Sequence, residues 1–485
     1  MFDVAIIGAG VTGCAIAREL SRFRLNIAVL EMGEDVAVAT TKANSGIVHA
    51  GYDAKPGTLK AEMNIAANPM FERLAQELEF PFTRNGSLVL CFSEENLPDL
   101  RDLYERGVNN GVPGLALLDR QQLQELEPNL GPAAIAALHA PTGGIVCPYE
   151  MTTAFAENAY DNGVAFYFNH KVETLQKLPE GFLVGCAGGK EFKTKVLINA
   201  AGLFADTIHN MLSAKPMKIA ARAGQYILLD KAAGALIHNT VFQLPGVMGK
   251  GILVSPTIDG NLLIGPTATD QEDKTDCSTN REAFEEIVSA ATLTMGTVPV
   301  RDTITAFTGL RAHNVEGDFV IEHLPDVPGM IDAAGIESPG LTSAPAIALR
   351  VSGLVEELLH PQINADFNPY RKAIPKFREM NTQERNAAIA RNPQYGRVVC
   401  RCETVTEGEV VASVRRPLGA RSLDMVKRRT RAGMGRCQGG FCSPAILEIL
   451  SRELGADPTA IRRAGPGSNI LVGKNKAVRQ GGKDA

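Results

Sequence analysis

The chain has 485 residues, 45% of them hydrophobic, which is enough for roughly three domains with buried cores. Its net charge of −5 divides into −14 for residues 1–396 and +9 from Arg397 onward. We expect no transmembrane segment, because no apolar run reaches the ~18 residues that span a bilayer, and no nucleic-acid binding, because no aromatic residues interleave with the basic ones.

The first expected elements form a dinucleotide-binding unit. An apolar strand runs into Gly8, Gly10 and Gly13 at the start of a helical pattern, and a second strand ends at Glu31. In this pattern the first glycine allows a tight turn, the second lets the backbone approach a pyrophosphate, and the third permits close packing of helix and strand. The carboxylate accepts hydrogen bonds from a ribose 2′-hydroxyl and repels a 2′-phosphate. The pattern therefore predicts a site for FAD or NAD and disfavours NADP.

Three later segments are suited to surround a flavin. Thr40–Gly51 follows the second strand, Lys195–Gly202 is a strand ending in a turn of small residues, and Ala333–Thr342 leads into a helix expected at Ser343–Leu359. The start of that helix carries a partial positive charge and faces whatever lies beside Gly340. A reduced flavin is negatively charged at its N1 edge, so such a helix end would stabilise it.

Between these segments the sequence predicts antiparallel sheet. Residues 251–266 contain two strands around a tight turn at Asp259–Gly260, and residues 182–199 contain two more around Gly188–Gly189. We expect two layers. One is a nucleotide domain assembled from separate segments, and the other is an antiparallel sheet that covers the substrate.

Four of the nine cysteines lie in the last quarter of the chain as two close pairs, Cys400/Cys402 and Cys437/Cys442. Four thiolates together can ligate zinc or an iron–sulfur cluster, and the spacing leaves both open. A flavin upstream favours the cluster, since zinc has no redox role. The odd cysteine count and the spacing favour a reducing compartment, so we expect a cytoplasmic protein. The remaining cysteines are isolated, as buried apolar positions often are, and are assigned no function: Cys14, Cys91, Cys147, Cys186 and Cys277.

Taken together, residues 1–360 resemble the FAD-dependent oxidoreductases of the D-amino-acid oxidase (DAO) family, which includes glycerol-3-phosphate and L-2-hydroxyglutarate dehydrogenases. Val399–Cys442 resembles the [2Fe-2S] domain of the bacterioferritin-associated ferredoxin (BFD) type. The combination is closest to the catalytic A subunits of anaerobic glycerol-3-phosphate dehydrogenases. The resemblance implies an α/β fold with a Rossmann-like FAD-binding domain, an antiparallel β-sheet substrate domain and a small helical C-terminal [2Fe-2S] domain.

The resemblance also gives expected domain bounds and ligands. The expected domains are an FAD-binding domain at 1–85, 146–215 and 301–360, a substrate domain at 86–145 and 216–300, a linker at 361–396, a BFD-like domain at 397–464 and a flexible tail at 465–485. The residues expected to bind FAD are Gly8, Gly10, Gly13, Glu31, Thr41, Asn44, Ser45, Val172, Gly202, Gly335, Pro339, Gly340, Leu341 and Thr342. The residues expected to ligate the cluster are Cys400, Cys402, Cys437 and Cys442.

Two residues are candidates for the chemistry. Oxidising an alcohol requires a base for the hydroxyl proton and an acceptor for the hydride. His49 lies in the expected flavin loop and is the leading base, although a loop histidine can equally be structural or a point of covalent flavin attachment. Arg311 follows a strand-like segment and comes shortly before the turn at Gly335–Thr342 that is expected to contact the flavin. Its planar guanidinium suits a phosphate or a carboxylate. The alternative for Arg311 is an ordinary surface ion pair.

Two departures leave the substrate open. The flavin loop reads Asn44-Ser-Gly where the anaerobic glycerol-3-phosphate subunits usually carry Asn-His-Gly, and Asn-Ser-Gly-x-x-His is closer to the L-2-hydroxyglutarate branch. The segment around Arg311 also lacks the proline that often follows this arginine in glycerol-3-phosphate enzymes.

Three hypotheses follow. The first is an FAD/[2Fe-2S] dehydrogenase that oxidises sn-glycerol 3-phosphate, a small anionic substrate, to dihydroxyacetone phosphate. The second keeps the cofactors and changes the substrate to a 2-hydroxy acid or an amino acid. The third is a non-catalytic electron-transfer or zinc-stabilised subunit. The basic C-terminal region fits an acidic partner or offsets the charge of a cluster, and the alternative is a solvated helical surface with an unstructured tail. With the resemblance, it implies partner subunits that pass electrons toward quinone and peripheral membrane association through them.

Overall fold

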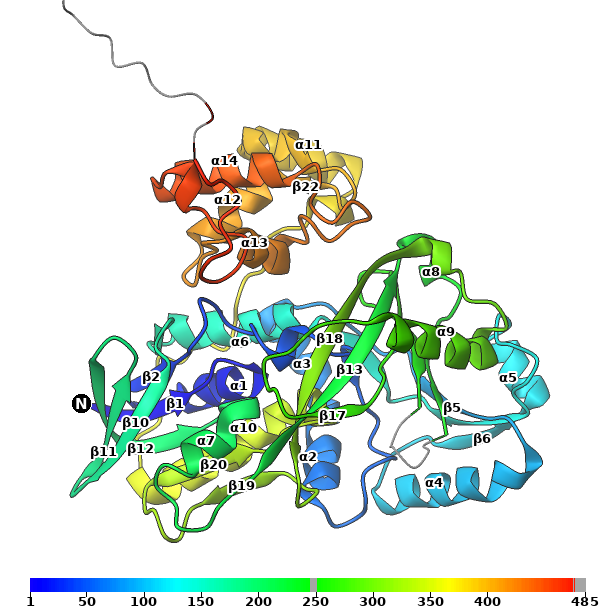
Figure 1. The fold of residues 1–485 in the computed structure, drawn as a ribbon, viewed down its shortest axis with the longest axis horizontal. Helices are drawn as coiled ribbons and strands as arrows, with labels where there is room; N and C mark the ends of the chain where they lie inside the picture. Colours follow the sequence, from blue (N-terminus) through cyan, green and yellow to red (C-terminus); the bar gives the residue numbers. More distant parts are fainter. Residues whose placement is uncertain (245–250, 474, 476–485) are drawn as a thin grey trace, which may run out of the picture. The chain divides into compact units, whose positions relative to one another are not determined.

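The structure is a computed structural model that describes residues 1–244, 251–473 and 475. It divides the chain into two compact units, Met1–Ala373 and Ile374–Ala485 (Figure 1). Residues 245–250 of the expected substrate domain, and residues 474 and 476–485 of the expected tail, lie outside the described part. Among the described residues, no helix combines the length and the apolar character that a membrane crossing requires.

The first unit contains an eight-stranded sheet with a parallel centre. Strand β1 (Phe2–Ile7) pairs in parallel with β2 (Ile27–Leu30) on one side and with β12 (Lys190–Asn199) on the other. β2 is buried along its whole length, as apolar strands in parallel sheets are, because helices cover both faces. The remaining strands are β9 (Ala165–Tyr167), β10 (Val172–Leu178), β11 (Gly181–Cys186), β19 (Val320–His323) and β20 (Met330–Ala334).

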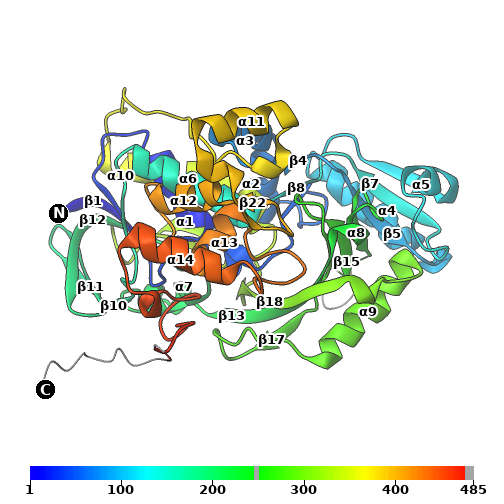
Figure 2. The same cartoon turned by 90° about the horizontal axis from the view of Figure 1, so that it is seen from above.

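Three helices of this unit pack on one another, with α1 (Val11–Leu20) in contact with both α6 (Pro148–Asp161) and α10 (Gly340–Leu359) (Figures 1 and 2). The last helix begins at Gly340 with Pro339 as its N-cap, slightly earlier than the sequence predicts. Its first turn therefore includes the glycine of the expected flavin turn. The smaller elements are α2 (Leu59–Ala67), α3 (Phe71–Leu78), α7 (Ala205–His209), and a three-stranded sheet of β3 (Ile47–Val48), β4 (Phe82–Thr83) and β8 (Gly144–Val146).

A second, nine-stranded sheet belongs to the same unit. Its longest pair is β13 (Ile219–Leu229) with β18 (Thr303–Asn314), which run antiparallel side by side (Figures 1 and 2). The remaining strands are β5 (Ser87–Cys91), β6 (Ala116–Asp119), β7 (Ala136–Ala140), β14 (Thr240–Gln243), β15 (Leu253–Pro256), β16 (Leu262–Gly265) and β17 (Thr269–Gln271). The helices around it are α4 (Leu97–Asn109), α5 (Arg120–Leu126), α8 (Lys231–Gly234) and α9 (Arg281–Met295). The expected hairpins are present as β15–β16 and β11–β12.

Two segments differ from their expected domains. Residues 303–314 are expected in the FAD-binding domain, but they form β18 of the second sheet because they pair with β13 along its whole length. Residues 361–396 do not form a separate linker. Up to Ala373 they pack in the first unit, where Arg371 forms an ion pair of 2.6 Å with the buried Glu157. From Ile374 they belong to the second unit.

The second unit is a small helical domain with its own apolar core, which includes Val410, Val426 and Leu450. Its helix starts are capped as the local sequence predicts. Thr406 and Glu409 form a capping box at one helix, and Asn381 and Glu384 form another. Its elements are α11 (Thr382–Arg391), α12 (Glu407–Arg415), α13 (Leu423–Thr430), α14 (Ser443–Leu454) and a two-stranded sheet of β21 (Val398–Cys400) and β22 (Val405–Thr406).

Candidate active site and cluster centre

A cavity of about 810 Å³ runs through the first unit. Residues from both sheets and from the start of α10 line it. The predicted site residues among its lining are Gly8, Gly10, Glu31, Thr41, Asn44, Ser45, His49, Val172, Gly202, Arg311, Pro339, Gly340 and Leu341. Three of the predicted FAD-binding residues do not line it: Gly13, Gly335 and Thr342.

The nucleotide end of the cavity is built on close backbone packing. Gly8 has a φ of +104°, and a Cβ at this position would lie 2.4 Å from the carbonyl oxygen of Ala200. Gly10 is the N-cap of α1, without a side-chain cap. The positive end of the helix is therefore open to a pyrophosphate. A Cβ on Gly13 would lie 2.0 Å from the carbonyl oxygen of Gly8. The turn therefore needs a residue without a side chain at this position.

Replacing Gly13 with alanine is expected to lower both the FAD content and the Tm, because the added Cβ collides with backbone. Overpacking of this kind costs about 1–3 kcal/mol or more. The matched control is Gly353→Ala within α10, where a Cβ meets no atom within 4 Å. Alanine there is expected to be neutral or stabilising by up to about 1 kcal/mol. Flavin absorbance per chain and thermal melting measure both variants, and equal values for the two would contradict the packing role of Gly13.

Glu31 is held by the backbone of the same turn. Its two carboxylate oxygens accept hydrogen bonds from the amides of Ala9 and Gly33, both at 2.7 Å. Burial raises the pKa of this carboxyl, and the two amide hydrogen bonds oppose the rise. An oxygen that accepts one hydrogen bond can accept another, so the site remains suited to a ribose hydroxyl.

The flavin loop is closed by its own polar side chains. Asn44 donates from Nδ2 to the carbonyl oxygen of Thr41 at 2.7 Å and accepts from the amide of Gly46 at 2.8 Å. The Thr41 hydroxyl accepts from the amide of Val11 at 3.1 Å, which ties the loop to α1. Ser45 Oγ lies 3.2 Å from the hydroxyl of Tyr226. The loop is thus fixed from both the nucleotide side and the second sheet.

Two of the residues outside the lining shape the flavin turn. The Thr342 hydroxyl accepts from the amide of His49 at 2.9 Å and so joins α10 to the loop that carries the candidate base. Gly335 has a φ of +65°, and a Cβ there would lie 2.7 Å from the Cβ of Asn314. Both are therefore suited to a supporting role. The residues that start α10 face the cavity, where its positive end can meet a flavin.

A buried polar network supports the turn after β12. Asn199 donates to the carbonyl oxygen of Ala205 at 2.9 Å and to Oδ1 of Asp332 at 2.8 Å. The ring of His209 reaches the other Asp332 oxygen at 2.6 Å and the carbonyl oxygen of Lys215 at 2.7 Å. Both partners are acceptors, which favours the doubly protonated, charged form of the imidazole. The hydrogen bond to Asp332 raises the pKa of His209 accordingly.

The two candidate catalytic residues both line the cavity. His49 Nε2 lies 3.4 Å from the hydroxyl of Ser338, and its ring packs 5.9 Å from that of Phe242. Arg311 donates to the carbonyl oxygen of Thr267 at 3.1 Å. In the described part of the chain Arg311 forms no ion pair with an acidic residue, so its charge is available to an anion.

Other charged residues of the cavity were not identified from the sequence. Glu337 accepts from Lys60 Nζ at 2.7 Å and from His313 Nδ1 at 3.0 Å. Burial tends to raise the pKa of Glu337, but Lys60 and His313 outweigh it and hold the pKa below its usual value. Arg222 and Tyr226, on β13, also line the cavity. Only the pairing of β13 with β18 brings them there, and no motif in the sequence marks that pairing.

The four cysteines of the second unit form two contacting pairs, Cys402 with Cys437 and Cys400 with Cys442. The Sγ atoms of Cys402 and Cys437 lie 3.9 Å apart. Cys400 and Cys442 form the buried side, each 2% exposed, while Cys402 is exposed. A Cβ on Gly435 would lie 2.3 Å from the Cβ of Cys402, so the loops need this glycine to approach one another.

The pKa values of the four thiols diverge within each contacting pair. The hydrogen bond to Cys400 raises the pKa of Cys442, and burial raises the pKa of Cys402. A hydrogen bond from Cys442, together with backbone amides, lowers the pKa of Cys400 to about 6. Backbone hydrogen bonds, the largest from Phe441, lower the pKa of Cys437 as well. Amides aimed at sulfur stabilise the charge of an iron–sulfur cluster and tune its potential. The four cysteines offer the thiolate donor set that a [2Fe-2S] cluster uses.

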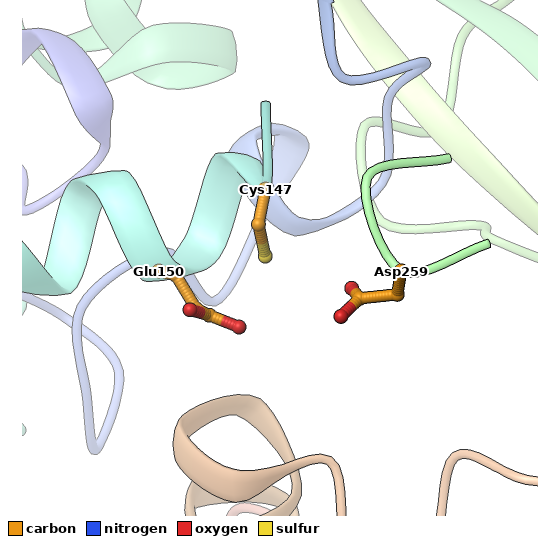
Figure 3. Close-up of side chains that lie close together, drawn as sticks. All are labelled: Cys147, Glu150 and Asp259. Carbon is orange, nitrogen blue, oxygen red and sulfur yellow. The ribbon is translucent and has the colours of Figure 1, made fainter. Parts of the chain in front are cut away.

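A second group of possible metal ligands lies in the first unit. Cys147, Glu150 and Asp259 point toward one another, with Asp259 reaching across from the β15–β16 turn (Figure 3). Their ligand atoms lie within 4.8 Å of one another. Burial, and then the two carboxylates, raise the pKa of the Cys147 thiol well above its usual value. A protonated thiol is a poor ligand and nucleophile, so we assign this group no function.

Comparison with known proteins agrees with the geometry. Residues 3–354 match the FAD dependent oxidoreductase (DAO) family, and residues 398–452 match the BFD-like [2Fe-2S] binding domain. The chain is 50% identical over 481 residues to glycerol 3-phosphate dehydrogenase of Caloramator mitchellensis, covering 99% of this chain and 100% of that one. It is 34% identical to glycerol 3-phosphate oxidase of Mycoplasma genitalium, over 76% of this chain and 97% of that one.

A solved structure shares the fold of the first unit. It is the L-alpha-glycerophosphate oxidase from Mycoplasma pneumoniae with FAD bound, at a TM-score of 0.73 and 29% identity, covering 76% of this chain and 98% of that chain. The chain therefore belongs to the FAD-dependent oxidoreductase family and carries a BFD-like [2Fe-2S] domain. It is an FAD-dependent oxidoreductase that is similar along its whole length to the Caloramator glycerol 3-phosphate dehydrogenase. The predicted fold class, family and cofactors are confirmed, and the zinc-stabilised, non-catalytic hypothesis is not supported.

Proposed function

We propose that the protein oxidises sn-glycerol 3-phosphate to dihydroxyacetone phosphate at its FAD and passes the electrons through the [2Fe-2S] cluster to a partner. The observation that carries the proposal is the cavity itself. It combines a nucleotide turn, a histidine on the flavin loop and the guanidinium of Arg311, whose charge no acidic residue in the described part of the chain neutralises by an ion pair. The whole-length similarity to a glycerol 3-phosphate dehydrogenase supports the same substrate.

The residues of the chain divide the chemistry between them. Arg311 binds the phosphate, because a guanidinium forms two parallel hydrogen bonds to such an anion. His49 accepts the proton of the substrate hydroxyl as the carbonyl forms. Bound FAD supplies the acceptor for the hydride that leaves the same carbon. Phe242, Leu253 and Tyr226 line the cavity and keep water away from the reacting atoms.

The second unit is suited to carry electrons outward. A [2Fe-2S] cluster accepts one electron at a time, which fits transfer from a two-electron flavin to a one-electron carrier. The exposed Cys402 and the half-buried Cys437 leave one side of the cysteine group accessible. The basic charge of the chain from Arg397 onward favours an acidic partner subunit. We propose that such partners pass the electrons toward quinone and provide any association with a membrane.

Product analysis tests the proposed substrate. Purified holoenzyme and an artificial electron acceptor are incubated with one substrate at a time: sn-glycerol 3-phosphate, L-2-hydroxyglutarate or an amino acid. The products are identified by mass spectrometry. We expect dihydroxyacetone phosphate in proportion to the acceptor reduced. Formation of 2-oxoglutarate, with no dihydroxyacetone phosphate, would replace the proposal with a 2-hydroxy acid dehydrogenase.

A further inference from the structure

Three charged side chains form a row across the sheet at the edge of the cavity. Arg222 on β13 lies directly opposite Arg311 on β18 and, on its other side, directly opposite Asp270 on β17. Residues directly opposite one another in antiparallel strands project from the same face of the sheet. The two guanidiniums therefore share a face, and both line the cavity.

This arrangement is unfavourable without a ligand. Like charges directly opposite one another destabilise an antiparallel pair. Asp270 is the one acidic residue of the row. It accepts from Nε of Arg222 at 2.6 Å and from its Nη2 at 3.2 Å, and it attracts Arg311 only at longer range. The Asp270 side chain is 54% exposed, so solvent weakens the ion pair. The row keeps an excess positive charge beside the cavity.

The pairing also leaves Arg222 able to bind something else. Asp270 engages two nitrogens of the guanidinium, Nε and Nη2, and a guanidinium carries five donors. Asp270 holds the planar group in one orientation at the cavity edge while Nη1 remains for a ligand. An anion between the strands can thus contact both arginines while the carboxylate stays in place.

We infer that Arg222 is a second anion-binding residue, which together with Arg311 binds the phosphate dianion of the substrate. The inference rests on the proposed function and deepens it. A phosphate carries nearly two negative charges and three acceptor oxygens, which match two guanidiniums, whereas a carboxylate is matched by one. Arg222 thereby favours glycerol 3-phosphate over a 2-hydroxy acid as the substrate, a choice that the Asn44-Ser-Gly motif leaves open.

The test compares Arg222→Met with wild-type holoenzyme. Methionine keeps the apolar stem and removes the repulsion with Arg311, so the variant should fold and retain FAD. We expect the preference for sn-glycerol 3-phosphate over glycerol, as a ratio of kcat/KM values, to fall about 10- to 100-fold, with the loss mainly in KM. Arg222→Lys keeps the charge and should restore part of the preference. The matched control is Arg281→Met on α9, where the arginine is 85% exposed and paired with Glu285.

Two results would overturn the inference. One is an unchanged preference for glycerol 3-phosphate over glycerol in Arg222→Met. The other is an equal loss with both substrates, which would make Arg222 a residue of the sheet framework. Binding of inorganic phosphate to the resting enzyme, read from the flavin absorbance, tests the same residue without turnover. If the wild-type enzyme oxidises no glycerol 3-phosphate, the proposed function fails, but weaker phosphate binding in Arg222→Met still supports the anion site and unchanged binding still rejects it.

Discussion

Replacing His49 with glutamine is expected to slow the reduction of the flavin by substrate about 100- to 10,000-fold, the range typical of losing a general base. Glutamine is close in size and keeps a polar end near Ser338, but it cannot accept the hydroxyl proton. The backbone amide of residue 49 still donates to Thr342, so the flavin loop should keep its shape. Anaerobic rapid-mixing absorbance at the flavin bands measures the rate directly.

His238→Gln is the matched control for this variant, because the same chemical change is made at a side chain that is 64% exposed. We expect His238→Gln to reduce its flavin at the wild-type rate, and both variants to contain FAD in wild-type amounts. A His49→Gln rate within about threefold of wild type, at full FAD content, would reject His49 as the base. A loss of FAD would instead show that His49 serves mainly to hold the cofactor or its loop.

Replacing Cys402 with alanine is expected to abolish electron delivery beyond the flavin while leaving flavin reduction intact. Cys402 is exposed, so its removal takes away a cluster ligand without opening the buried core around Cys400 and Cys442. A reductive titration measures how many electrons each chain takes up. The wild-type chain should take up about three electrons, of which two belong to the flavin and one to the cluster, and the variant about two.

The control for the cluster variant is Cys277→Ala, which removes an exposed, isolated cysteine of the first unit. It should retain the broad visible absorbance of the cluster and take up about three electrons. If Cys402→Ala kept the cluster absorbance and the third electron, the ligand set would be wrong. If Cys402→Ala also lost substrate reduction of the flavin, the flavin reaction would not be independent of the cluster domain.

Motifs that depend on local chemistry could be predicted from the sequence. Gly13 is required by its contact with the Gly8 oxygen in the same short turn, so the glycine spacing signals the turn. Gly8 is confined as well by Ala200, a contact that the motif does not reveal. The cysteine pairs at 400/402 and 437/442 could be recognised for the same reason, since each pair is nearly contiguous. The glycine turn and the cysteine pairs can each be recognised from short stretches of sequence.

Features that depend on pairing between distant strands could not be predicted. Arg222 and Arg311 are 89 positions apart in the sequence, and only the register of β13 with β18 places them opposite one another. The same register explains why residues 303–314 belong to the second sheet. The network of Lys60, Glu337 and His313 likewise joins a helix, a turn and a strand. No periodicity or spacing within one segment predicts such contacts between residues of distant segments.

The end of the FAD unit was also beyond sequence reasoning. Residues 361–373 are rich in proline and asparagine and have the composition of a linker. In the structure this segment is anchored, since the Arg371 side chain donates to the carbonyl oxygen of Leu78 at 2.9 Å as well as to Glu157. Composition describes local flexibility, but long-range ion pairs decide where such a segment packs.

Anaerobic stopped-flow absorbance of the holoenzyme mixed with sn-glycerol 3-phosphate tests the central claim most directly. We expect prompt loss of the flavin bands, followed by bleaching of the broad cluster absorbance as the first electron moves to the cluster. A flavin that stays oxidised with glycerol 3-phosphate but is reduced by L-2-hydroxyglutarate would contradict the proposed substrate. A cluster that stays oxidised while the flavin is fully reduced would contradict the proposed path of the electrons.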